Sequence, residues 1–80
     1  MPYFIYIVQC SDTTLYTGIT TDVQRRVDEH NHSEKGAKYT KLRRPVHLVY
    51  TEIAENRSIA SKREYAIKKL SRHAKLALIA

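Results

Sequence analysis

The feature that most restricts how this chain folds is a pair of short β-type segments at its start. Residues 3–8 form an uninterrupted aromatic and β-branched run, which is typical of a central strand. The turn-forming residues Ser-Asp-Thr follow at 11–13, and residues 14–19 form a second short run. The sequence therefore predicts an antiparallel hairpin within the first twenty residues.

A helix is predicted directly after this hairpin. Thr21–Gln24 has the T-x-x-Q pattern of a capping box, which satisfies the free amides at the start of a helix. The helix is expected over residues 22–32. Arg26 and His30 are four residues apart in it and therefore share one flank.

The rest of the chain predicts an alternation of extended and helical segments. These are a loop over residues 33–45, a third strand over residues 46–51, a second helix from a cap at Asn56 or Ser58 to Leu70, and a short last helix capped by Ser71. The inner stripe of the second helix is expected at Ile59, Arg63, Ala66, Ile67 and Leu70. The order of the segments indicates an α+β fold, and 80 residues without a linker or repeat indicate a single domain over residues 1–80.

The charge of the chain is unbalanced, with 14 Lys and Arg against 8 Asp and Glu and a formal net charge of +6. Two clusters hold most of the excess: Lys35, Lys38, Lys41, Arg43 and Arg44 in the first, and Lys62, Arg63, Lys68, Lys69, Arg72 and Lys75 in the second. Concentrated positive charge on so small a body favours a polyanionic partner. A basic protein without such a partner is the other interpretation that charge alone allows.

The single cysteine, Cys10, excludes an internal disulfide. It ends an apolar run and is expected in the core, and a zinc site is not expected with one cysteine and scattered histidines. No apolar run approaches the ~20 residues that span a bilayer, and no signal-type segment begins the chain. The sequence therefore predicts a soluble cytoplasmic protein with no membrane partner.

The six residues of most interest for chemistry are Tyr6, Tyr16, Gly18, Arg26, His30 and Glu64, and all of them except the glycine carry groups suited to phosphodiester hydrolysis. That reaction needs an activated water, neutralisation of the phosphate charge and usually a metal ion. An Arg fork matches two phosphate oxygens, and one carboxylate suffices for Mg²⁺ when waters and substrate fill the other positions. Each residue also has a structural interpretation. Tyrosines in strands often serve in packing, carboxylates on helices often pair with lysines, and glycines often allow turns or bulges.

The spacing of these residues resembles the GIY-YIG nuclease superfamily, and in particular its small stand-alone bacterial members of the YhbQ type. The resemblance covers essentially the whole chain. It rests on the segments Phe4-Ile5-Tyr6, Tyr16-Thr17-Gly18-Ile19-Thr20, Asp22–Val27 with His30, Gly36–Thr40, Arg43–Val46, Leu48–Tyr50, Arg63-Glu64 and Ile67–Leu70. The two short motifs are degenerate, so the specific signal is their spacing, together with Arg26 after the second motif and Glu64 on a later helix. The resemblance implies a three-stranded antiparallel sheet flanked by helices, with the site on one sheet face.

The resemblance also implies roles for individual residues. Tyr6 and Tyr16 would order or activate the attacking water, with Tyr16 as the general base. Arg26 would neutralise the phosphate, and His30 would assist the water or the leaving group. Glu64 would hold one divalent ion, Mg²⁺ or Mn²⁺.

The chain departs from the family pattern at four points, one of which is Ile19, where the nucleotide-excision-repair nucleases of the superfamily carry a Lys. Phe4 stands in place of the first Gly of the motif and Thr17 in place of its Ile, whereas both tyrosines and Gly18 are kept. No Asn follows Glu64, although many superfamily nucleases carry a late Asn that supports the site.

The basic loop and the later lysines are candidates for binding nucleic acid. Tyr39 would stack on a base while the cations hold phosphates, or it is an ordinary, partly buried loop residue. The expected nucleic-acid-binding set is Lys35, Lys38, Tyr39, Lys41, Arg43, Arg44, Lys68 and Lys69.

Three classes of function follow. The first is a metal-dependent endonuclease acting on DNA, with RNA as the alternative substrate and with specificity that is low or supplied by a protein partner. The second is a non-catalytic nucleic-acid-binding module that keeps the fold, and the third is an interaction domain without a nucleic-acid role. Salt-dependent binding separates the third class from the others, and cleavage that requires Glu64 separates the first.

Overall fold

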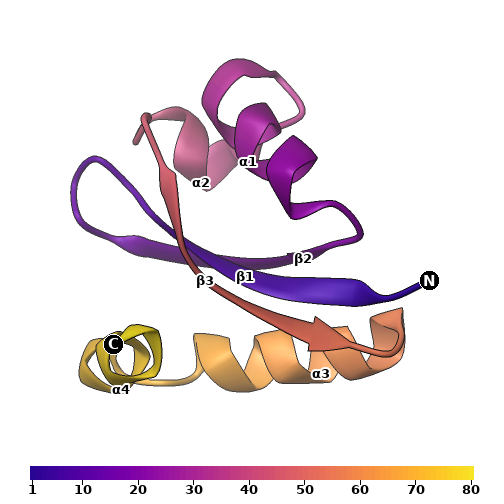
Figure 1. Ribbon diagram of the computed structural model, residues 1–80. Coiled ribbons are helices and arrows are strands. Elements are labelled where there is room, and N and C mark those ends of the chain that lie inside the picture. Colours follow the sequence, from indigo (N-terminus) through magenta and orange to yellow (C-terminus); the bar gives the residue numbers. More distant parts are fainter.

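The computed structural model describes residues 1–80, and its framework is a three-stranded antiparallel sheet in the order β2-β1-β3 (Figure 1). The elements in chain order are β1 (Tyr3–Gln9), β2 (Leu15–Thr20), α1 (Val23–His32), α2 (Lys38–Lys41), β3 (His47–Ala54), α3 (Arg57–Lys68) and α4 (Arg72–Ile79). The predicted hairpin, the α+β class and the three-stranded sheet are confirmed. None of the helices is both long enough and apolar enough to cross a membrane.

Helices cover both faces of the sheet. Figure 1 shows α1 and α2 on one side of the strands and α3 and α4 on the other. Because side chains alternate along β1, this strand contributes to two separate hydrophobic clusters. The cluster under α3 consists of Ile5, Ile7, Ala54, Ala60 and Ile67. The cluster under α1 consists of Tyr6, Val8, Cys10 and Val46, with partly buried Tyr16 and Val27 against it. The expected core position of Cys10 is thereby confirmed.

Each of the three longer helices begins at a side-chain cap. Asp22 of α1, Asn56 of α3 and Ser71 of α4 accept a hydrogen bond from the backbone N–H three residues further along. The predicted caps at Asn56 and Ser71 are confirmed. The capping box at Thr21 is wrong, because the Asp22 carboxylate takes the cap position one residue later.

Two predicted boundaries differ from the structure. The short helix α2 forms inside the segment 33–45, which was expected to be a loop, because the Ala37 carbonyl accepts hydrogen bonds from two later amides. The third strand continues to Ala54 instead of ending at residue 51, because its ladder with β1 extends as far as Tyr3.

The buried stripe of α3 is also displaced from the predicted one. Ile67 is buried as expected, but Ala60 is its buried companion. Ile59 and Leu70, which were expected to face inward, are 45% and 37% exposed. Arg63 instead forms a bidentate pair with Glu52 of β3, with Nε and Oε2 2.7 Å apart.

The segment that leads into β3 is tied to the end of α1. Asn31 Nδ2 donates to the Val46 carbonyl at 2.9 Å, and the Val46 amide donates to Asn31 Oδ1 at 2.7 Å. The Arg44 guanidinium donates to the carbonyl oxygens of His30 and Ser33, both at 2.6 Å. Carbonyls at the end of a helix have no intrahelical partner, so Arg44 caps α1 and fixes the entrance of β3 relative to it.

Gly18 makes room for the Tyr6 ring on the α1 side of the sheet. The two residues are opposite each other across β1 and β2. A Cβ atom at position 18 would lie 2.4 Å from Tyr6 Oη and 2.6 Å from its Cζ. Neither glycine of the chain has a positive φ. Packing against Tyr6, rather than a turn or bulge, therefore requires a glycine here.

We expect Gly18→Ala to lower the free energy of unfolding by about 1–3 kcal/mol, because overpacking forces the Tyr6 ring or β2 to move. Urea denaturation measures this change. In a Tyr6→Leu background, where the ring is absent, the added methyl group should cost much less. An equal cost in both backgrounds would contradict the packing explanation.

Candidate active site

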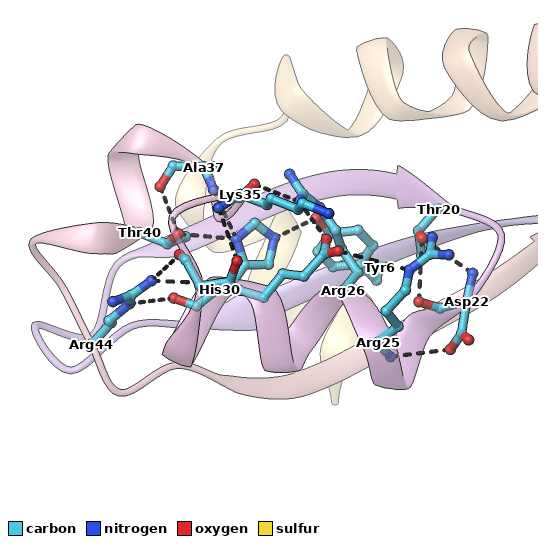
Figure 2. A network of polar contacts seen from close by, with 12 residues as sticks. Tyr6, Thr20, Asp22, Arg25, Arg26, His30, Lys35, Ala37, Thr40 and Arg44 are labelled. Atoms are coloured by element: carbon cyan, nitrogen blue, oxygen red, sulfur yellow. Dashed lines mark hydrogen bonds and ion pairs between the residues drawn. The ribbon is translucent and has the colours of Figure 1, made fainter.

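The side chains of Tyr6 and His30 meet between the sheet and α1. Tyr6 Oη and His30 Nε2 lie 2.6 Å apart, and the two residues are 1% and 0% exposed (Figure 2). Tyr6 comes from the middle of the central strand, and His30 comes from the last turn of α1. A single buried hydrogen bond therefore joins the strand motif to the helix.

Tyr16 and Arg26 extend this group. The Tyr16 ring meets the His30 ring edge-on, with 5.4 Å between the centroids. Arg26 lies one turn before His30, and its Nη1 donates to the Glu29 carboxylate and to a loop carbonyl, each at 2.9 Å. Its positive charge also acts on Tyr6, whose pKa it lowers against the larger effect of burial. The structure thus brings the four expected catalytic side chains into one region.

Glu64 approaches the same region from the other side of the sheet. Its helix, α3, packs against β2 and β1. The Glu64 carboxylate forms an ion pair with Lys68 at 3.4 Å, and the Lys68 ammonium lies 5.9 Å from the centre of the Tyr16 ring. The charge of Glu64 also contributes to the raised pKa of Tyr6. Lys68 therefore links the expected metal ligand to the Tyr16 ring, although the helix that carries Glu64 covers the opposite face of the sheet.

Burial sets the protonation of the central pair. It raises the pKa of Tyr6 from 10.0 to about 12, although Arg26 opposes part of the change. Burial, with a further contribution from the charge of Arg26, lowers the pKa of His30 from 6.5 to about 4. At neutral pH Tyr6 is therefore a neutral phenol and His30 a neutral imidazole.

The donor atoms present limit which metal ion this region could hold. No group of three or more His, Cys, Asp or Glu side chains that could hold a metal occurs in the 80 residues. Glu64 alone cannot form the protein cage typical of zinc or calcium, but it fits Mg²⁺, which keeps several waters and shares oxygens of a bound phosphate.

A surface hollow lies elsewhere, on the outer side of α1, and it contains none of the expected catalytic residues. Its lining consists of Asp22, Gln24, Arg25, Asp28, Glu29, His32 and Ser33.

The expected nucleic-acid-binding residues have different environments. Lys35, Lys38 and Lys41 are exposed and form no ion pair. Arg44 is only partly exposed, and its guanidinium is occupied by carbonyl oxygens at the end of α1. Its position is that of a structural clamp rather than of a phosphate contact.

Tyr39 is 38% exposed, and its ring packs on two neighbouring side chains. It stacks on Tyr16 with 5.8 Å between centroids and an interplanar angle of 24°. The Cζ atom of Arg43 lies 3.9 Å from the centre of the Tyr39 ring, and Arg43 is held by Asp12 at 3.1 Å. The ring of Tyr39 thus has structural contacts with Tyr16 of β2 and with Arg43, and its stacking on a base stays a prediction.

Two residues beside the site, Ala37 and Thr40, were given no role by the sequence pattern, although they lie in one of the segments that carry the family resemblance. Thr40 Oγ1 lies 3.0 Å from His30 Nδ1, and the Ala37 amide donates to the same nitrogen at 3.2 Å. Both occur in a polar segment, where a threonine is ordinarily exposed, yet Thr40 is completely buried. Gly36 just before them is the one hint in the sequence, because a Cβ atom there would lie 2.6 Å from the Glu29 carbonyl oxygen.

The fold is an α+β domain that brings these side chains to one region of its sheet. The GIY-YIG catalytic domain matches this chain over residues 2–77. The chain therefore belongs to the GIY-YIG family, whose nucleases act on nucleic acids and generally use a divalent metal ion.

Within this family the chain is similar to UPF0213 proteins. It is 64% identical over 77 residues to one from Desulfotalea psychrophila, which covers 96% of this chain and 70% of that protein. It is 60% identical over 77 residues to one from Staphylococcus aureus, with 96% and 93% covered. The solution NMR structure of a UPF0213 protein from Bacillus halodurans has a TM-score of 0.63 at 46% identity, over 99% of this chain and 83% of that one. A protein from E. faecalis, also solved by NMR, has a TM-score of 0.64 at 47% identity, over 94% and 79%.

The lowered pKa of His30 predicts a specific dependence of stability on pH. Because the folded pKa of about 4 lies below the ordinary value of 6.5, folding favours the neutral imidazole. Its stabilising contribution is complete above pH 6.5 and is lost progressively as the pH falls toward 4. We expect a total loss on the order of 2–3 kcal/mol from this residue.

Urea denaturation between about pH 7 and about pH 5 measures most of this loss while carboxylates stay largely ionised. His30→Gln should flatten the pH dependence in this window, whereas the exposed His47→Gln should leave it unchanged. An equally steep dependence in His30→Gln would show that another group is responsible.

Proposed function

We propose that this chain is a divalent-metal-dependent endonuclease that hydrolyses phosphodiester bonds in DNA with low intrinsic sequence specificity. The observation that carries the proposal is the meeting of two tyrosines, a histidine and an arginine near one carboxylate, namely Tyr6, Tyr16, His30, Arg26 and Glu64. Membership of the GIY-YIG family supports it. RNA is the alternative substrate class, and the cytoplasm is the proposed location.

Tyr16 is the proposed general base. Tyr6 is enclosed by His30 and by the backbone at Gly18, and burial raises its pKa to about 12, so it is poorly suited to take a proton from water. Tyr16 lies on the outer strand β2 and is only partly buried, which leaves it accessible to water. Tyr6 would instead order the substrate or the water by a hydrogen bond.

Arg26 is the proposed contact to the scissile phosphate. Its hydrogen bonds to Glu29 and to the loop carbonyl both use Nη1. The edge formed by Nε and Nη2 therefore stays available for a two-pronged contact with phosphate oxygens. The ion pair with Glu29 fixes the guanidinium before substrate arrives, which lowers the entropy cost of binding.

Glu64 is the proposed ligand of one Mg²⁺ or Mn²⁺ ion, because a single carboxylate fits a largely hydrated ion completed by substrate. When bound, such an ion stabilises negative charge on the departing oxygen. In the protein alone Lys68 neutralises the Glu64 carboxylate, so a metal ion must compete with this ion pair. We therefore expect metal affinity to be weak without nucleic acid.

Exposed lysines flank the group and would hold neighbouring phosphates of the substrate. On the loop side these are Lys35, Lys38 and Lys41, and on α3 and just beyond it they are Lys68 and Lys69. Contacts to phosphates give affinity and position but do not read the base sequence. Low sequence specificity follows, unless a protein partner supplies recognition.

A non-catalytic nucleic-acid-binding module is the second candidate. It is favoured by the presence of only one carboxylate near the tyrosines and by the lack of an Asn after Glu64. Such a module would bind DNA or RNA with a steep dependence on salt and would cleave neither.

Plasmid nicking in the presence of Mg²⁺ separates the two candidates. We expect cleavage by the wild type and none without the ion. Glu64→Gln, which removes the charge at nearly constant shape, should slow cleavage roughly 100-fold or more, because the metal contributes several kcal/mol of transition-state stabilisation.

The exposed carboxylate Glu55 provides the matched control, since Glu55→Gln makes the same chemical change away from the site and should leave the rate unaltered. Equal rates for Glu64→Gln and the wild type would exclude Glu64 as the metal ligand. Salt-dependent binding with no cleavage by the wild type would favour the second candidate.

A further inference from the structure

The nitrogen of His30 that faces away from Tyr6 lies in a buried cradle formed by the loop before α2. The Ala37 N–H donates to Nδ1 at 3.2 Å, and Thr40 Oγ1 lies 3.0 Å from the same atom (Figure 2). The Thr40 hydroxyl also lies 2.9 Å from the Ala37 carbonyl oxygen, and because it has a single proton it donates to that carbonyl or to Nδ1, but not to both. His30 and Thr40 are both 0% exposed, so water does not compete for these bonds.

This cradle requires a close approach of the loop to α1. A Cβ atom at Gly36 would lie 2.9 Å from the Cα of His30 and 2.6 Å from the carbonyl oxygen of Glu29. Both are backbone atoms, which cannot move away as a flexible side chain could. Gly36 therefore allows the loop to bring the Ala37 amide onto the imidazole.

The donors in the cradle decide which nitrogen of His30 carries the proton. A backbone amide can only donate, so Nδ1 must offer a lone pair to Ala37. A proton on Nδ1 would instead face the Ala37 N–H directly. The neutral imidazole therefore carries its proton on Nε2, and it donates this proton to the oxygen of Tyr6 across the 2.6 Å contact.

The direction of this bond fixes the Tyr6 hydroxyl as well. When the Tyr6 oxygen accepts from His30, its own proton is not used by His30 and is free to point into the site. In the opposite tautomer His30 would accept that proton, and Tyr6 would have none to offer a ligand.

We propose that Thr40 gives its one hydroxyl proton to Nδ1 and is therefore, together with the Ala37 amide, a positioning residue that holds His30 in the Nε2–H tautomer and so directs the Tyr6 hydroxyl proton toward the substrate. The effect of Thr40 on catalysis rests on the proposed nuclease function. The hydrogen bonds that fix the His30 tautomer do not depend on that function. Thr40 touches neither substrate nor metal and acts through His30 and Tyr6.

Long-range ¹H–¹⁵N NMR spectra of the ¹⁵N-labelled protein at neutral pH test the proposal without any substrate. The expected spectrum gives His30 a pyridine-like Nδ1 signal and a pyrrole-like Nε2 signal. Thr40→Val, which removes the hydroxyl at nearly constant shape, should move these signals toward the Nδ1–H form, and Thr40→Ser should restore them.

Thr17→Val is the matched control, because Thr17 is also buried, at 3% exposed, but pairs with Ile7 on the other face of the sheet. It should leave the His30 signals unchanged. If the wild type shows the Nδ1–H form, or if Thr40→Val shifts the signals toward Nε2–H or not at all, the proposal is wrong.

Cleavage assays on the same variants then test the consequence. We expect kcat to fall roughly 10-fold in Thr40→Val with KM little changed, and to recover in Thr40→Ser, as for other residues that orient a reacting group. If the wild type cleaves nothing, the nuclease function fails while the NMR result still decides the tautomer. Normal kcat in a Thr40→Val protein with an altered tautomer would overturn the link from Thr40 to the reaction.

Discussion

The hydrogen bond between Tyr6 and His30 is the constraint on which the rest of the structure depends. It lies between the sheet and α1, beside an apolar cluster, and both partners are buried. Breaking it would leave two buried polar groups without partners, which costs more than one solvent-exposed hydrogen bond contributes. The surroundings are adapted to it, since Gly18 leaves space for the phenol and Gly36 lets the loop reach the imidazole. No buried side-chain polar atom in the protein lacks a partner.

The three-layer arrangement explains how residues far apart in sequence approach one another. The central strand contributes Tyr6 to the α1 side, and the outer strand β2 contributes Tyr16 beside it. Because β2 is an edge strand, α3 on the opposite face can bring Glu64 and Lys68 close to Tyr16 around that edge. A wider sheet on that side would separate the carboxylate from the tyrosines.

Much of the framework could be predicted from the sequence because local chemistry determines it. The apolar run at residues 3–8 forms the central strand, and Asn56 and Ser71 cap helices as their side chains allow. The face of α3 could not be read from its pattern, since Ile59 and Leu70 fit a helical stripe but remain exposed while the small Ala60 is buried. Which face of a helix is buried depends on the surface that the helix packs against. The spacing of apolar residues in the helix does not reveal that surface.

The same limit applies to the candidate site. Spacing and family resemblance suggested the tyrosines, Arg26 and His30, which the fold brings together. Charge suggested that Arg44 binds nucleic acid, yet it caps α1, because a guanidinium also satisfies free carbonyl oxygens. Thr40 lies in a segment that carries the resemblance but was given no role, because its contact with His30, ten residues earlier, follows only from the fold.

Under the proposed function, Glu64 and the tyrosines form one metal-dependent site at the β2 edge. Titration of the ¹⁵N-labelled protein with Mn²⁺ tests it most directly, because a paramagnetic ion broadens nearby amide signals even when binding is weak. The signals of Glu64, Tyr16 and their neighbours should broaden first, and Glu64→Gln should abolish the effect. Broadening centred on the acidic outer side of α1, around Asp22 and Asp28, and unaffected by Glu64→Gln, would contradict it.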